Sequence, residues 1–216
     1  MIEQLNIFSI IVVSAVLGFV VFAGEILWYK KILSNELSRK FIHIVGGLWI
    51  ASWPFLIDFP EIKVLSALMF TVALTSHYFK IFSSIHSVSR QTYGAVLFPL
   101  GILMTSFITE DPWVFFVAVA HLALADGLAA VVGKKWGKKI AYHIGHEAKT
   151  VLGSVTFLLC SLVITTFYIL LSGRYEDYVW LLIAMPITLS IIENTTIKGL
   201  DNLLVPIAVV FLISNL

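Results

Sequence analysis

The chain has 216 residues, of which 59% are hydrophobic and only 12% are charged, and its formal net charge is +1. About a quarter of the residues of an ordinary soluble domain are charged, so this composition excludes a soluble globular protein and predicts an integral membrane protein. The single cysteine, Cys160, lies in an apolar run, which excludes a disulfide framework and a thiolate metal site.

Eight apolar segments follow one another along the chain, and a membrane-spanning helix needs about 20 such residues. In chain order they cover residues 5–28, 41–57, 62–79, 93–109, 112–132, 151–172, 177–193 and 201–215. The runs are continuous rather than alternating, so they indicate helices and not the strands of a barrel. The third, fourth and last runs are short or polar at one end, which leaves seven helices as an alternative to eight. Because the connections are short, we predict one all-α polytopic transmembrane domain over residues 1–216.

Lysine and arginine are concentrated on one side of this predicted bundle. The connections after the first, third, fifth and seventh segments hold all but two of the 14 basic residues, and the exceptions are Lys63 and Arg174. Basic connections of membrane proteins are cytoplasmic, so both termini are expected on the non-cytoplasmic side. The lysines that lie outside the helix ends can serve only to orient the protein in the membrane, without a role in binding.

An aspartate at membrane depth is the strongest functional signal. Asp126 lies in the alanine-rich turn LALADGLAA, and no basic residue within one helical turn could neutralise it. A charge at the bilayer centre costs on the order of 3 kcal/mol, so its compensation must come from another helix, from water or from a metal. We therefore predict a functional role for this carboxylate.

Further polar residues lie inside the helix ends on the same predicted side. The second segment begins LSRKFIHIVGG, where Arg39 and His43 are four residues apart and share a helix face. The seventh segment ends at Glu193, and the eighth begins at Asp201-Asn202. We expect these residues to converge at the cytoplasmic half of the bundle. Interfacial anchoring of the arginine and simple packing of the histidine are the alternatives.

The lysine-rich connection ends at Lys149-Thr150, which open the sixth segment. Free backbone N–H groups at a helix N-terminus bind anions, so this end suits the phosphates of a nucleotide or of lipid headgroups. The glycines before it could let a nucleotide approach the backbone or let two helices pack closely. His143, His146 and Glu147 fit no standard zinc spacing, so we expect a solvated loop there. His121 is expected to be a packed histidine.

Four motifs of this sequence resemble the motifs of a known family. DGLAAVVGKKWGKK followed by KTVLGS resembles the D-x-x-A-x-x-x-G-x-x-x-G-K then K-[ST]-x-x-G-S signature of the polyprenol kinase family, which includes phytol kinase and dolichol kinase. ELSRKFIHIVGG is similar to the family's R-K-x-x-H-x-x-x-G opening, SRQTYGAVLFPLG to its Pro-Leu-Gly segment, and ENTTIKGLDNLLVPI to its closing Glu and D-N-x-x-x-P. One position departs: Leu152 stands where members commonly have an acidic residue.

The resemblance implies transfer of the γ-phosphate of CTP to the hydroxyl of a membrane-embedded prenoid alcohol such as phytol, geranylgeraniol or dolichol, at the cytoplasmic face. It implies Mg²⁺ as the cofactor, with CTP, the alcohol and the bilayer as partners and no nucleic acid. The implied catalytic residues are Asp126, His43, Glu193 and Asp201, of which Asp126 and Asp201 would bind the metal. The implied nucleotide-binding residues are Arg39, Lys40, Gly133, Gly137, Lys138, Lys149, Thr150, Gly153, Ser154 and Asn202. Whether His43 or a carboxylate takes the hydroxyl proton stays open.

Two other functions are weighed against this one. A CTP:phosphatidate cytidylyltransferase uses the same nucleotide. The long C-terminal signature of cytidylyltransferases, rich in lysine, aspartate and H-G-G, is absent here. A small non-enzymatic transporter would place its polar residues near the midplane, between two symmetric halves. The sequence has no visible internal symmetry, and its polar residues gather toward one membrane face, so we favour the kinase.

Overall fold

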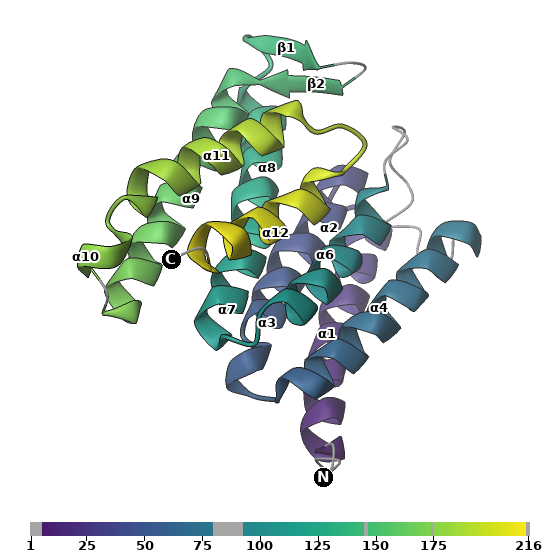
Figure 1. Ribbon diagram of the computed structural model, residues 1–216. Helices are drawn as coiled ribbons and strands as arrows, with labels where there is room; N and C mark the ends of the chain where they lie inside the picture. The colour runs from purple at the N-terminus through teal and green to yellow at the C-terminus, as the bar shows by residue number, and fades with distance from the viewer. Residues whose placement is uncertain (1–5, 80–92, 145–146, 174, 215–216) are drawn as a thin grey trace.

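The computed structural model describes residues 6–79, 93–144, 147–173 and 175–214, which form a bundle of helices with a small β-hairpin at one end (Figure 1). The helices are α1 Ile7–Tyr29, α2 Asn35–Phe41, α3 Gly47–Ala51, α4 Phe59–Phe79, α6 Gly94–Ile108, α7 Pro112–Ala120, α8 Asp126–Trp136, α9 Val151–Ser172, α10 Tyr175–Tyr178, α11 Leu181–Thr195 and α12 Asp201–Ser214. Every apolar segment found in the sequence contains helix, which confirms the prediction of a helical bundle. Lys80, Arg90, His146 and Arg174 lie outside the described residues.

Some of these helices are long enough to cross a membrane by themselves. Four meet this condition by length and composition: Ile7–Tyr29, Phe59–Phe79, Pro112–Trp136 and Val151–Ser172. Three further apolar helices are shorter: Gly94–Ile108, Leu181–Thr195 and Asp201–Ser214. The chain is therefore an integral membrane protein. The number of complete spans and the side on which the termini lie stay predictions.

Two of the helical segments contain a five-residue π-helical turn. α2 continues through Ile42–Gly46 into α3, and α7 continues through His121–Ala125 into α8. Such turns widen a helix locally and occur frequently at functional sites. His43 lies inside the first turn, and Asp126 is the first residue after the second. Two of the sequence candidates, His43 and Asp126, thus stand where the helix departs from regular α geometry.

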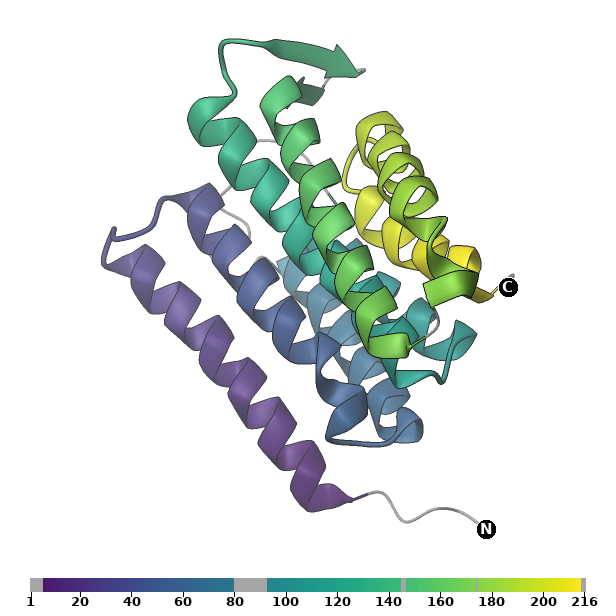
Figure 2. The same cartoon turned by 90° about the vertical axis from the view of Figure 1, so that its left-hand side faces the viewer.

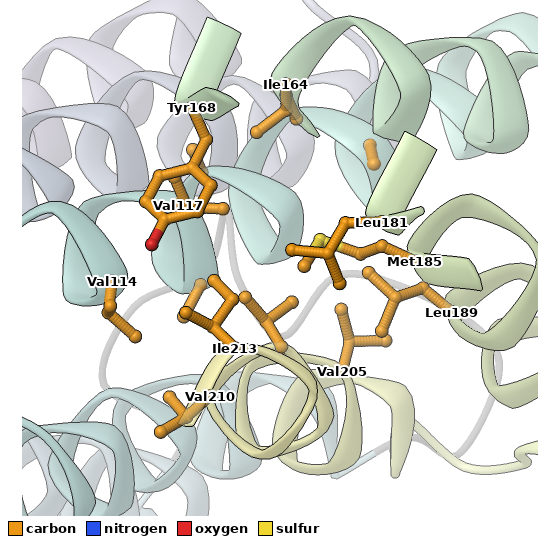
Figure 3. Packing of buried hydrophobic residues seen from close by; sticks show 14 of the residues in the cluster. Val114, Val117, Ile164, Tyr168, Leu181, Met185, Leu189, Val205, Val210 and Ile213 are labelled. Carbon is orange, nitrogen blue, oxygen red and sulfur yellow. The ribbon is translucent and has the colours of Figure 1, made fainter. Parts of the chain in front are cut away.

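The segment formed by α7 and α8 is the centre of the bundle. On one side, buried apolar residues of α7, α9, α11 and α12 pack together (Figure 3). On the other, Phe115 and Val119 of α7 pack with Ile50 and Trp53, and with α1 and α4. α1 lies at the outer edge of the bundle (Figure 2) and exposes residues such as Phe19 and Ile11. Exposed apolar side chains are what a helix presents to lipid, so α1 is a peripheral helix.

The connection before α9 is more ordered than the sequence suggested. β1 Ala141–Ile144 pairs antiparallel with β2 Glu147–Thr150, and Tyr142 lies opposite Lys149. The loop expected at His143 and Glu147 is therefore a hairpin, while the side chain of His143 is exposed to solvent as predicted. Side chains of β1 alternate between exposed and half-buried, which is the period of a strand. The hairpin delivers β2 directly to the N-terminus of α9.

Candidate active site

Asp126 is neutralised by residues from another helix. Its Oδ2 atom lies 2.6 Å from Nζ of Lys40 and 3.2 Å from Nε2 of His43, although 86 residues separate Lys40 from Asp126 in the chain. Lys40 is only 4% exposed and Asp126 only 7%. A buried charge needs such pairing, because the desolvation of an isolated ion costs several kcal/mol. The charge of Asp126 is therefore compensated by residues of another helix, which is one of the three sources that the sequence left open.

The hydrogen bonds of His43 define which of its ring nitrogens can accept a proton. Nε2 lies 2.9 Å from the backbone oxygen of Leu122 and 3.2 Å from the carboxylate of Asp126. Both of these oxygens are acceptors, so the Nε2 atom carries the proton and donates it. In the neutral ring, Nδ1 then keeps its lone pair. His43 is thus oriented as a histidine that could accept a proton at Nδ1.

A polar cavity of about 420 Å³ adjoins this cluster. Twelve of the fourteen residues singled out in the sequence line it: Arg39, Lys40, Asp126, Gly133, Lys138, Lys149, Thr150, Gly153, Ser154, Glu193, Asp201 and Asn202. These residues come from α2, α8, the turn after α8, β2, α9, α11 and α12. The two exceptions are Gly137, which does not line the cavity, and His43, which lines a second cavity. The helix ends converge as expected, and the roles of the individual residues stay predictions.

Several buried polar atoms of this cavity lack a partner. Five buried side-chain nitrogen or oxygen atoms of the described residues make no hydrogen bond, and three of them belong to the cavity lining: Arg39 Nε, Glu193 Oε2 and Asn202 Oδ1. Buried polar groups are nearly always hydrogen-bonded, so unsatisfied ones call for an explanation. A cation and two oxygen acceptors in one cavity could bind an anionic group and a cation.

Lys149 is held in the cavity wall by α11. Its Nζ atom lies 2.9 Å from Oε1 of Glu193 and also contacts the backbone oxygen of that residue. Arg39 is held in a similar way by Glu36, with 2.6 Å between Nη2 and Oε1. Glu36 was missed in the sequence, although its position three residues before Arg39 on one helix is a recognisable signal. Both cations are therefore fixed at the cavity by a carboxylate.

The N-terminus of α9 is partly satisfied by the protein itself. Oγ1 of Thr150 accepts a hydrogen bond from the N–H of Gly153 at 3.1 Å, and the N–H of Val151 donates to Ile140. Two of the N–H groups after Thr150 thus already have partners within the protein, and the expectation that free N–H groups there bind phosphate stays a prediction. The threonine acts as the N-cap of the helix, for which its hydroxyl is well suited.

A second group of polar side chains closes the cavity near β1. The hydroxyl of Tyr142 lies 2.6 Å from Oγ of Ser154, and the Ser154 hydroxyl donates to Oδ1 of Asn194 at 2.7 Å. Asn194 in turn donates to the backbone oxygen of Ser190 at 2.8 Å. No sequence motif singled out Tyr142 and Asn194, since only the hairpin brings β1 to α9 and α11. This network fixes Ser154 at the cavity wall.

The donor set of the cavity fits a magnesium ion. Asp126, Glu193 and Asp201 offer carboxylate oxygens, and Asn202 offers its unpartnered Oδ1 atom. Oxygen atoms are the ligands that Mg²⁺ prefers, and protein sites often supply only one or two carboxylates beside substrate phosphates. Among the described residues, no group of three or more His, Cys, Asp or Glu side chains is gathered for a metal. The carboxylates of the described residues are therefore not gathered into a preformed metal cage, and an ion bound here would need further ligands.

Gly133 of α8 and Gly137, which follows α8, both lie against the N-terminus of α9. A Cβ atom added at Gly133 would lie 2.5 Å from Oγ1 of Thr150 and 3.2 Å from Cα of Gly153. One added at Gly137 would lie 2.6 Å from the same Oγ1 atom. The structure supports the close-packing interpretation for Gly133 and for Gly137. Only Gly133 also lines the polar cavity.

The Gly133→Ala substitution is expected to destabilise the protein by about 1–3 kcal/mol, because the added methyl group overpacks the contact between α8 and α9. Thermal unfolding of the purified protein in detergent should show a lower midpoint than for wild type. The matched control is Gly18→Ala, since an added Cβ at Gly18 meets no atom within 4 Å. Equal midpoints for Gly133→Ala and wild type would contradict the close contact.

Two other residues from the sequence lie away from the cavity. Leu152 is 39% exposed and is not part of the cavity lining, so the departure from the family pattern falls outside the polar cavity. His121 is fully buried, with Nδ1 at 2.8 Å from the oxygen of Val117 and Nε2 at 3.1 Å from Oγ of Ser161. Both ring nitrogens have partners, which supports the expected packing role.

Comparison with known proteins gives matches over most of the chain. It is 30% identical over 200 residues to a phytol kinase of Synechocystis sp., covering 88% of this chain and 84% of that protein. It is 25% identical over 224 residues to phytol kinase 1, chloroplastic, of Arabidopsis thaliana, covering 91% and 72%. An uncharacterized protein of Methanocaldococcus jannaschii is 28% identical over 194 residues, covering 84% and 94%. No family model matches the chain, and no solved structure matches it significantly.

Proposed function

The chain belongs to the phytol kinase family, and from this membership we propose that it transfers the γ-phosphate of CTP to the hydroxyl of a membrane-embedded prenoid alcohol. The observation that carries the proposal is the polar cavity, which combines fixed cations, carboxylates and unpartnered buried atoms. Phosphoryl transfer depends mostly on positioning and on neutralising charge, so these groups are the ones that it needs.

The reaction requires a meeting point between water and lipid. CTP is soluble, whereas a prenoid alcohol lies in the leaflet with its hydroxyl near the interface. Arg39 lines both the polar cavity and the second, apolar cavity, and His43 lines the apolar one while contacting Asp126 of the other. The boundary between the two cavities is thus where we place the transferred phosphate and the hydroxyl.

We assign charge neutralisation to Lys149, Lys138 and Arg39. These cations line the polar cavity and would contact the phosphates of CTP. Asp126 and Asp201, with Glu193 beside them, would hold the magnesium ion. The bound ion supplies further positive charge for the phosphate oxygens.

We assign the acceptance of the hydroxyl proton to His43. The alcohol oxygen forms a bond to the γ-phosphorus, the bond from that phosphorus to the bridging oxygen breaks, and CDP leaves. The proton of the hydroxyl passes to Nδ1, which is the lone-pair nitrogen while Nε2 donates to Leu122 and Asp126. The resulting imidazolium is stabilised by the Asp126 carboxylate.

We also propose that the polar cavity opens to the cytoplasm. The β-hairpin lies at one end of the bundle (Figure 1), and Lys134, Lys138 and Lys149 line the polar cavity. Lysine-rich ends of membrane proteins are cytoplasmic by the positive-inside rule. Cytoplasmic CTP and magnesium would then reach the site without crossing the membrane.

Purified protein with γ-labelled CTP, Mg²⁺ and a panel of alcohols is expected to yield labelled lipid phosphate with phytol or geranylgeraniol. Removal of divalent ions with EDTA should abolish labelling, and added Mg²⁺ should restore it, because the phosphates depend on the ion for charge neutralisation. Release of label as pyrophosphate when phosphatidate is offered would instead indicate a cytidylyltransferase. Absence of transfer to any lipid would contradict the kinase and leave a transporter as the alternative.

A further inference from the structure

A second cavity of about 610 Å³ lies between α1, the α2–α3 segment, α4 and α6. Most of its lining is apolar and includes Leu17, Met69, Val72 and Phe98. Arg39 and His43 also line it, and His43 contacts Asp126 of the candidate active site. An apolar cavity that reaches a polar site in this way can receive the hydrocarbon part of a substrate.

The exposed part of the cavity lining comes from α1 and α4. Among the described residues that line the cavity, those of the α2–α3 segment, of the turn after it and of α6 are buried or half-buried. The exposed lining residues all lie on α1 or α4, and they are Ser14, Gly18, Phe22, Leu68 and Val72. Phe22, Leu68 and Val72 are 64%, 57% and 56% exposed. Because a residue that both lines a cavity and is exposed lies at its opening, the cavity opens between α1 and α4.

This opening faces the hydrocarbon of the bilayer. α1 and α4 are both long and apolar enough to cross a membrane. Beside the opening they expose further apolar side chains that do not line the cavity, such as Phe19 on α1 and Leu74 on α4. Lipid is the surrounding that such a helix surface requires. A molecule that passes between α1 and α4 therefore comes from the membrane and not from water.

Two hydrogen bonds define the register of α1 against the α2–α3 segment: Ser38 Oγ to the oxygen of Gly24 at 2.7 Å, and Trp49 Nε1 to the oxygen of Val13 at 3.0 Å. Eleven residues separate the two donors, and eleven separate the two acceptors in the opposite direction. The two helical segments are therefore antiparallel, and each step along one corresponds to a step back along the other.

Gly18 lies in the opening at the depth of His43. His43 is five residues after Ser38, and Gly18 is six residues before Gly24, so the register places the two at nearly the same depth. A Cβ atom added at Gly18 would meet no atom within 4 Å. Glycine at this position therefore leaves the opening wide beside His43.

The opening is closed at the other end of α1. The carboxylate of Glu61 accepts a hydrogen bond from the backbone N–H of Asn6, just before α1, at 2.5 Å, and one from that of Asp58, just before α4, at 3.0 Å. From this end, α4 leans away from α1 toward the end of the bundle that carries the hairpin (Figure 1). The two helices are thus joined far from His43 and leave the cavity open closer to it.

We infer that the acceptor alcohol enters sideways from the bilayer, between α1 and α4, and that its hydroxyl reaches His43 by passing Gly18. The inference rests on the proposed kinase function and adds the route by which the lipid substrate arrives. Transfer of an apolar chain into water is unfavourable, and on this route the chain never leaves an apolar surrounding. CTP, in contrast, is assigned to the polar cavity on the other side of His43.

Gly18→Trp is expected to lower kcat/KM by at least about tenfold for phytol and for geraniol alike, because a large side chain in the opening hinders entry whatever the length of the chain. Binding of labelled CTP should stay as in wild type. The matched control is Val16→Trp, since Val16 is also exposed on α1 but does not line the cavity. The control should keep the wild-type kcat/KM for both alcohols.

The α4 side of the opening gives an independent test. Val72→Trp should cause the same loss, whereas Leu74→Trp, two residues along the same helix and outside the cavity lining, should not. If either Gly18→Trp or Val72→Trp fails to fold, the other still tests the route. Wild-type kcat/KM for phytol in a folded protein with either substitution would overturn the inference.

A labelling experiment separates this inference from the kinase proposal. A photoactivatable phytol analogue in phosphatidylcholine vesicles should label the helices around the apolar cavity, excess phytol should compete, and Gly18→Trp but not Val16→Trp should reduce the labelling. This pattern in a protein that phosphorylates no alcohol would refute the kinase alone. Competed label on α9, α11 or α12 of an active kinase, or label that Gly18→Trp leaves unchanged, would refute the route alone. Neither transfer nor competed label would overturn both.

Discussion

Asp126→Asn is expected to lower the rate of phosphoryl transfer by about 10³-fold or more, the scale that a single charged group carries in such reactions. The substitution removes a proposed magnesium ligand and the carboxylate that contacts both Lys40 and His43. Single-turnover transfer from γ-labelled CTP to phytol measures the effect. A rate equal to that of wild type would remove the central assignment of the site.

Loss of activity in this variant needs a control for stability. Asp126→Asn leaves Lys40 as a buried cation without its counter-charge, and breaking a buried pair in this way costs about 3–5 kcal/mol. In the double variant Lys40→Met with Asp126→Asn, both charges are removed, so the thermal midpoint should recover toward that of wild type. Activity should stay absent. A double variant that regains activity would show that Asp126 acts only in folding.

His43→Gln is expected to lower kcat by about 10²–10⁴-fold, the usual contribution of a general base, with little change in KM for CTP. The reason is that His43 lies at the boundary with the apolar cavity, whereas the nucleotide is assigned to Lys149, Lys138 and Arg39 in the polar one. The dependence of kcat on pH should also lose the limb that reports protonation of the base.

The matched control is His121→Gln, because His121 is the other histidine of a π-helical turn and lines neither of the two cavities described above. This variant removes bonds to Val117 and Ser161 and is expected to affect stability rather than the transfer step. If His43→Gln keeps the wild-type rate and pH profile, a carboxylate takes the proton instead.

From the sequence alone, the class of the protein and most of the residues that line the polar cavity could be predicted. Hydropathy depends only on neighbouring residues, so eight apolar segments could be located along the sequence. Each of them contains helix. Charged residues inside apolar segments are equally visible, because lipid makes them costly wherever the helices go. The positions of these charged residues at the helix ends, together with the family resemblance, were enough to predict twelve residues that line one cavity.

The sequence could not determine which of these residues touch each other. Asp126 is paired with Lys40, which the sequence assigned to the nucleotide, and His43 faces a separate apolar cavity. The hairpin and the packing of Gly133 against Thr150 were likewise missed or left open. In a membrane helix, apolar residues cover nearly every face, so the amphipathic period that would indicate which face turns inward is weak. Only the tertiary packing sets the rotation of each helix, and with it the pairs of charges and the open space beside Gly18.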